Sequence, residues 1–139
     1  MHVPWAEACY MKAYALFELD QLDAAKAALG HALHLSPQNS RYLSELGQIH
    51  QHRRAWDDAR AQYEAAESAA EFSPPEEKLR DLTRAKRGVG FVLIEQGKLD
   101  AAEAKFRQCL ALDPDDHGAR NELEYIAQMR AQAARRSQK

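Results

Sequence analysis

The sequence contains an internal repeat. The segment LDAAKAAL at residues 22–29 returns as LDAAEAKF at residues 99–106, and each copy runs on to a proline, Pro37 in one and Pro114 in the other. A further copy, WDDARAQYEAA at residues 56–66, lies between them and has small and large residues at the same places. Repetition of this kind indicates similar units that stack on one another and share a continuous core.

The composition indicates that these units are helical. Ala is abundant, Gly (6) and Pro (5) are sparse, and the β-branched residues Val and Thr are rare. Such a composition favours helix over strand. We therefore expect an all-α chain.

Three copies align on positions that alternate between small and large residues. They share a small residue in the first helix of each unit (Ala13, Gly47, Gly90), an alanine in the second (Ala25, Ala59, Ala102), a large residue four positions later (Leu29, Tyr63, Phe106) and another small residue (Ala32, Ala66, Cys109). This pattern resembles the tetratricopeptide repeat, a 34-residue helix-turn-helix unit. The resemblance implies a right-handed α-solenoid of antiparallel helix pairs with about seven helices.

The alignment predicts one domain over residues 1–139. The repeats span about residues 6–39, 40–73 and 83–116, so that an inserted extension occupies about 71–82, and a capping helix follows at about 117–135. In the insertion, Ser73 and Glu76 have the spacing of a capping box, which predicts a long helix from Pro75 to about Gln96. Leu79 and Leu82 should pack on one side of this helix against Phe72.

Charge and hydropathy exclude two classes of partner. The 19 basic and 21 acidic residues leave a net charge of −2, which gives no electrostatic footprint for nucleic acid. No apolar run approaches the roughly 18 residues of a membrane span, and the chain starts without signal-peptide features. We expect a cytoplasmic protein in which Cys9 and Cys109 are reduced and buried.

Motifs of stand-alone catalysis are absent from the sequence. It has no phosphate-binding loop, no dinucleotide fingerprint, no nucleophile elbow and no zinc-protease motif. His31 and His34 lack a third metal ligand. Paired acids such as Asp57 and Asp58 stand at predicted helix starts, where they complement the helix dipole. We predict a non-enzymatic chain with no cofactor and no metal.

The resemblance implies a binding site on the concave side of the solenoid, formed by the first helix of each repeat. A groove of this kind takes a peptide or a partner's helix. Aromatic side chains at one end and arginines at the other would suit a segment with an apolar anchor and a carboxylate. The groove-facing positions are Tyr10, Met11, Tyr14, Phe17, Glu18, Arg41, Ser44, Glu45, Gln48, His52, Arg84, Arg87, Phe91 and Glu95.

Several alternatives stay open at this point. Some of the aromatic rings, Tyr10, Phe17 and Phe91, can be core residues instead. The clamp with which some members of the family hold a chaperone's C-terminal carboxylate is not preserved, because its positions read Tyr10, Tyr14, Glu45, Arg84 and Gly88. Lys12 and Lys86 also stand at usually apolar positions.

Two further roles compete with groove binding. The chain could form a homo-oligomer by packing its N-terminal helix, which carries Trp5, against a second copy. It could also target an attached catalytic domain. Fold resemblance alone does not decide between these roles and a peptide-binding adaptor.

Overall fold

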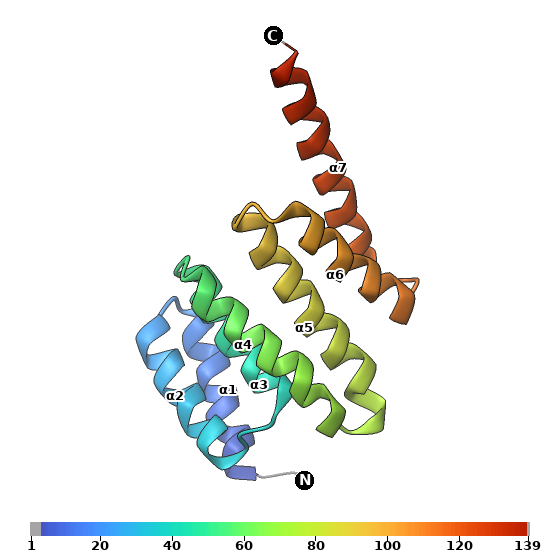
Figure 1. The fold of residues 1–139 in the computed structure, drawn as a ribbon. Helices are drawn as coiled ribbons and strands as arrows, with labels where there is room; N and C mark the ends of the chain where they lie inside the picture. Colours follow the sequence, from blue (N-terminus) through green and yellow to red (C-terminus); the bar gives the residue numbers. More distant parts are fainter. Residues whose placement is uncertain (1–3, 139) are drawn as a thin grey trace.

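The computed structural model describes residues 4–138, which form seven α-helices and a short 3₁₀ helix, with no strand among them (Figure 1). The predicted all-α solenoid is confirmed, since successive helices pair antiparallel and the pairs stack along the chain. The elements are α1 (Pro4–Glu18), α2 (Leu22–Leu35), α3 (Ser40–His52), α4 (Trp56–Ala69), η1 (Ala70–Phe72), α5 (Pro75–Glu95), α6 (Leu99–Leu112) and α7 (His117–Ser137). None of these helices is long and apolar enough to cross a bilayer.

The turn inside each helix pair has one residue in the left-handed region. These residues are Asp20 (φ 60°), Arg54 (φ 60°) and Gly97 (φ 77°). Only glycine adopts this conformation without a steric cost from Cβ. The turn between α3 and α4 therefore holds an arginine where the turn between α5 and α6 holds the preferred residue.

The helices of each pair approach closely where a small residue faces a large one. A Cβ on Gly90 of α5 would lie 2.6 Å from the Phe106 ring of α6, and a Cβ on Gly47 of α3 would lie 2.9 Å from the Tyr63 ring of α4. In the first pair the corresponding residues are Ala13 and Leu29. Ala13 is larger than the glycines of the other two pairs, and Leu29 is smaller than their aromatic residues. Complementary volumes therefore keep the three pairs similarly packed.

The buried apolar residues form two clusters. The N-terminal cluster joins α1, α2 and α3 and consists of Ala6, Tyr10, Ala13, Ala25, Ala28, Leu29, Ala32, Tyr42 and Ile49. The C-terminal cluster joins α4, α5, α6 and α7 and consists of Ala59, Tyr63, Val89, Val92, Leu93, Ile94, Ala102, Phe106, Cys109, Ala119 and Ile126. The boundary between them falls between α3 and α4.

The insertion forms η1 and the first two turns of α5. The predicted long helix is correct in its bounds, but the predicted capping box is wrong. Because α5 begins at Pro75, its N-cap is Pro74, and Ser73 lies one residue too early. The Ser73 hydroxyl donates instead to Asp81. The predicted packing around Phe72 is not realised as a buried contact, since Phe72 and Leu79 are both exposed.

Lys86, at a usually apolar position, is accommodated by an ionic cluster between helix pairs. Its ammonium group donates to Glu67 of α4 and to Gln108 of α6, and Lys105 of α6 donates to the same Glu67 carboxylate. Lys12, by contrast, is exposed on α1.

The last helix closes the C-terminal end of the array. Asp116 caps α7 by accepting from the Ala119 amide, and Arg130 donates to Asp100 and Glu103 of α6. Ile126 is buried, whereas residues 131–138 are exposed, and α7 extends beyond the rest of the chain (Figure 1).

Candidate groove site

The predicted site residues lie on α1, α3 and α5, the first helices of the three pairs; we call the side that carries them the groove face. Their exposure differs widely. Met11 and Tyr14 are 58% and 51% exposed, whereas Tyr10 and Glu45 are buried. Exposed too are Glu18, His52 and Glu95; Ser44 is buried, and the half-buried residues are Phe17, Arg41, Gln48, Arg84, Arg87 and Phe91.

Tyr10 belongs to the core rather than to the open face. Its ring stacks on Tyr42 at a centroid distance of 5.1 Å, and the Arg41 guanidinium lies 4.5 Å from its centre on the exposed side. Arg41 in turn donates to both oxygens of Glu7, at 3.0 and 2.8 Å, and the Tyr42 hydroxyl donates to Glu7 at 3.0 Å. Burial and the bond to Glu7 raise the pKa of Tyr42 to about 12. This part of the face is a closed network.

The centre of the face is occupied by a second internal ion pair. Arg84 of α5 donates to the buried carboxylate of Glu45 on α3 at 2.5 Å, and its guanidinium lies 3.5 Å from the Gln48 amide oxygen. The Tyr63 ring of α4 packs between Gly47 of α3 and Gly88 of α5, and its hydroxyl donates to Gln51 at 2.7 Å.

Tyr63 explains the glycine at one clamp position. A Cβ on Gly88 would lie 2.4 Å from the Tyr63 ring, so no side chain fits there without displacing the ring. At this clamp position the packing of α4 against α5 therefore requires glycine, and a cationic side chain is excluded.

Arg87 is paired as well. Its guanidinium donates at 2.8 Å to Asp116, the buried N-cap residue of α7. The expectation of a basic end that binds a ligand carboxylate therefore needs correction. Each of the three predicted arginines, Arg41, Arg84 and Arg87, already binds a carboxylate of this chain.

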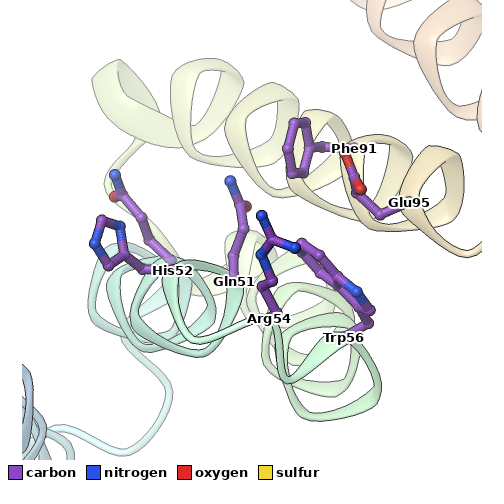
Figure 2. Close-up of a pocket in the computed structure, with 7 residues that line it drawn as sticks. Gln51, His52, Arg54, Trp56, Phe91 and Glu95 are labelled. Atoms are coloured by element: carbon purple, nitrogen blue, oxygen red, sulfur yellow. The ribbon is translucent and has the colours of Figure 1, made fainter.

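A pocket of about 340 Å³ lies at the C-terminal ends of α3 and α5 (Figure 2). The Trp56 and Phe91 rings lie 6.4 Å apart and form its apolar part. Arg54 makes no ion pair among residues 4–138. The lining consists of Gln48, Gln51, His52, Arg54, Trp56, Phe91 and Glu95.

Sequence reasoning placed Gln48, His52, Phe91 and Glu95 on this side but missed Gln51, Arg54 and Trp56. Signals for the last two exist: Trp56 is an aromatic where the other copies have Leu22 and Leu99, and Arg54 aligns with Gly97. His52 also contacts Phe17 of α1 edge-on, with ring centroids 5.6 Å apart, and so connects the pocket to α1.

Glu122 of α7 is a further charged group, which the predicted groove positions do not include. Extending the 34-residue spacing from Gly88 would have found it. Burial raises the pKa of Glu122, and the nearby Glu95 carboxylate raises it further. Two carboxylates, Glu95 and Glu122, therefore lie near each other where α5 ends, and this part of the groove face is acidic.

Neither thiol is placed for chemistry in the described part of the chain. Burial raises the pKa of Cys109 to about 11, and its thiol points to the Thr83 carbonyl. Cys9 is half-buried, and both cysteines are free. Within residues 4–138, no three His, Cys, Asp or Glu side chains gather into a metal-binding group.

Comparison with known proteins connects this geometry to a family. Sequence profiles described as tetratricopeptide repeat match residues 10–74 and residues 89–116. No curated protein sequence matches the chain.

Solved structures share the fold over nearly the whole chain. The first TPR domain of Spaghetti (RPAP3), bound to the HSP90 peptide SRMEEVD, superposes with a TM-score of 0.80 at 20% identity, covering 94% of this chain and 97% of that one. The type III secretion chaperone SycD of Yersinia enterocolitica, in complex with a YopD peptide, gives 0.76 at 17% identity, covering 93% and 97%. The O-GlcNAc transferase of Thermobaculum terrenum gives 0.74 at 22% identity, covering 91% of this chain but only 23% of the enzyme.

Proposed function

From the premise that the chain belongs to the tetratricopeptide repeat family, we propose that it is a non-enzymatic protein-interaction module that holds a segment of a partner protein on the groove face. Two proteins of similar fold are in complex with peptides. The observation that carries the proposal is the pocket of Trp56, Phe91 and Arg54, whose lining residue His52 contacts Phe17 of α1.

Trp56 and Phe91 offer the apolar contact for an anchoring side chain of the partner, and the other five residues of the pocket lining are polar or charged. The pocket volume of about 340 Å³ lies in the range of small ligand sites, roughly 300–1,000 Å³. Trp56 and Phe91 offer rigid aromatic area there, which is typical of residues that dominate binding energy. Elsewhere on the groove face, Arg41, Arg84 and Arg87 are already held by ion pairs within the chain. Their side chains therefore lose little conformational entropy when a partner binds.

Arg54 is the cation that an acidic group of the partner would bind in this pocket, although the pocket lining also carries the carboxylate of Glu95. Of the arginines on the groove face, it is the one without a carboxylate partner among residues 4–138, whereas Arg41, Arg84 and Arg87 are neutralised internally. A carboxylate next to the apolar anchor would meet Arg54 with the planar geometry that guanidinium groups favour. The partner therefore differs from one held through the chaperone clamp.

The test is affinity capture from native lysate with three forms of the chain as bait. Tyr14→Asp with Arg54→Glu alters two exposed groove-face residues. Leu112→Asp is the control for the Tyr14→Asp change, because it places the same new charge on an exposed apolar residue of α6. The proposal predicts a partner, identified by mass spectrometry, that the wild-type and Leu112→Asp baits retain and the double variant loses at least tenfold. Equal retention by all three baits would place binding on another surface.

Self-association is a second candidate role, favoured by the outer side of α1. Trp5 is 77% exposed on α1, and Leu19, directly after the last residue of α1, is 67% exposed. If this side mediates pairing, light scattering of the purified chain will give the mass of a dimer, and Trp5→Asp will restore a monomer. A monomer at high concentration would contradict the role.

A further inference from the structure

A larger cleft, of about 590 Å³, lies at the N-terminal ends of the first helices, away from the groove pocket. The turn between α2 and α3, from Leu35 to Tyr42, forms one wall. The other wall comes from Phe72–Pro74 and from Glu77 and Asp81 of α5, and the start of α1 closes the cleft. We call it the insertion cleft.

The second wall exists because of the nine extra residues between the second and third repeats. Pro74, Glu77 and Asp81 of that wall lie within the nine extra residues, 74–82, and Phe72 and Ser73 come directly before them. A first helix of ordinary length in the third repeat would begin near Thr83 instead of Pro75 and would leave the turn between α2 and α3 open.

The chemistry of the cleft is acidic with an apolar rim. Leu35 and Phe72, at opposite walls, are 44% and 58% exposed. The lining has three carboxylates, Glu7, Glu77 and Asp81, against one guanidinium, that of Arg41, which is bound to Glu7. The net charge of the lining is therefore negative.

Asp81 is the buried charge of this site, with 5% of its surface exposed. One carboxylate oxygen accepts from the Ser73 hydroxyl at 2.8 Å. The nearest basic group is Arg80, whose guanidinium lies 3.8 Å from the other oxygen and 3.8 Å from Glu77, beyond hydrogen-bond distance for both. The second carboxylate oxygen of Asp81 accepts no hydrogen bond from residues 4–138, so it is the acceptor that a ligand cation would reach.

We propose that the insertion cleft binds a segment of a partner protein in which a lysine or arginine stands next to a large apolar side chain. The basic group reaches Asp81 and Glu77, and the apolar group covers Phe72 and Leu35. An acidic segment is disfavoured by the like charge of the lining. The site shares no lining residue with the groove pocket, so the chain would hold its partner, or two partners, at two places.

The experiment uses the full chain and three capped pentapeptides, ALKFA, ALQFA and ALEFA, which differ only in the central side chain. Backbone amide shifts are followed by NMR as each peptide is titrated to millimolar concentration. The proposal predicts that ALKFA shifts the amides of residues 35–42 and 72–81, with an affinity at least fivefold above ALQFA and tenfold above ALEFA. Raising the salt concentration should narrow these ratios.

Variants separate charge from folding and from groove binding. Asp81→Asn with Glu77→Gln keeps the shape of the lining and should reduce ALKFA affinity to that of ALQFA. Phe72→Ser, at an exposed position, should weaken ALKFA and ALQFA alike. The groove variant Tyr14→Asp should leave all three affinities unchanged, so failure of the groove proposal is distinguishable from failure of this one. Circular dichroism confirms that each variant folds.

Three results would overturn the proposal: equal binding of ALKFA and ALEFA, shifts that fall on the residues of the groove pocket instead, or no shifts at millimolar peptide. Shifts on α7 residues 131–138 that depend on protein concentration, with a larger sedimenting mass, would point to Arg135 and Arg136 of a second copy as the occupant and would also contradict it.

Discussion

The N-terminal and C-terminal clusters differ in size and in what covers them. The N-terminal cluster is built largely from alanines around Leu29 and Ile49, and the outer side of α1 leaves Trp5 and Leu19 exposed. The C-terminal cluster contains a run of branched residues from α5 and the fully buried Phe106, and α7 covers its end. In a linear array each unit is stabilised by itself and by its neighbours. Helices α1 and α2 should therefore be the first to open.

The contacts at the junctions between helix pairs are also more extensive in the C-terminal half than in the N-terminal half. Between α4, α5 and α6, Glu67 binds two lysines at once, and the long α5 packs along α4 and η1. Between α1 and α3, the corresponding link is the cluster of Glu7, Arg41 and Tyr42. The difference suggests that the second junction couples its repeats more tightly than the first.

The largest expected effect comes from truncating the central side chain of each cluster. Both Phe106→Ala and Leu29→Ala remove a fully buried side chain, and we expect losses of about 3–5 and about 2–4 kcal/mol of unfolding free energy respectively. Phe106→Ala should destabilise the whole chain. Leu29→Ala should open α1 and α2 while α5 and α6 stay folded. Urea titration gives the free energies, and hydrogen exchange of amides in α2 and α6 locates the opening.

Equal loss of protection in α2 and α6 for Leu29→Ala would show that the chain unfolds as one cooperative unit. In that case the two clusters would be a division of the packing but not of the stability.

The sequence predicted the helices and their pairing well because those features depend on local repetition. Ala25, Ala59 and Ala102 recur at one position of the second helix, and all three are fully buried. The bounds of α5 also followed from local signals, since consecutive prolines end the preceding chain and start the helix. Its cap was mispredicted by one residue, which is the usual precision of such signals.

The pairing of charged side chains on the groove face could not be predicted in the same way. Arg41 binds Glu7 and Arg84 binds Glu45, across 34 and 39 residues of sequence. Whether an arginine on a predicted groove position points to a ligand or to a neighbouring helix depends on what that helix offers. Tyr10 is similar: its position is that of a groove residue, but the Tyr42 ring on the next helix draws it into the core.

A second prediction tests the tighter junction through its pH dependence. Burial raises the pKa of Glu67, but hydrogen bonds from Lys86 and Lys105 outweigh burial and hold it below the ordinary value of about 4.5. Folding therefore favours the ionised form. The stabilisation is present above pH 4.5 and is lost as the pH falls through the folded pKa.

Glu67→Gln should cost about 1–3 kcal/mol at pH 7, because two lysines lose their anion. It should also flatten the fall of stability below pH 4.5. The matched control is Glu64→Gln on the same helix, which breaks an exposed pair with Arg60 and should cost less than about 0.5 kcal/mol. Urea midpoints at pH 7 and pH 3.5 measure both effects. A Glu67→Gln variant that retains the full wild-type acid dependence would remove this junction from the comparison.

The smallest effect concerns the turns, where the middle pair differs from the pair that follows it. Arg54 adopts the left-handed conformation that Gly97 adopts in the next turn, so Arg54→Gly should relieve strain and raise the unfolding free energy by about 0.5–1 kcal/mol. Asp20→Gly should gain less, because Asp tolerates this region better than Arg does. Gly97→Ala is the counterpart that should lower the unfolding free energy. Thermal unfolding of the three variants ranks the turns by the strain of their left-handed residue. If Arg54→Gly is stabilised and also weakens capture of the groove partner, the strain is retained for binding; if stability rises with capture unchanged, Arg54 is a neutral turn residue and the groove proposal rests on Trp56 and Phe91 alone.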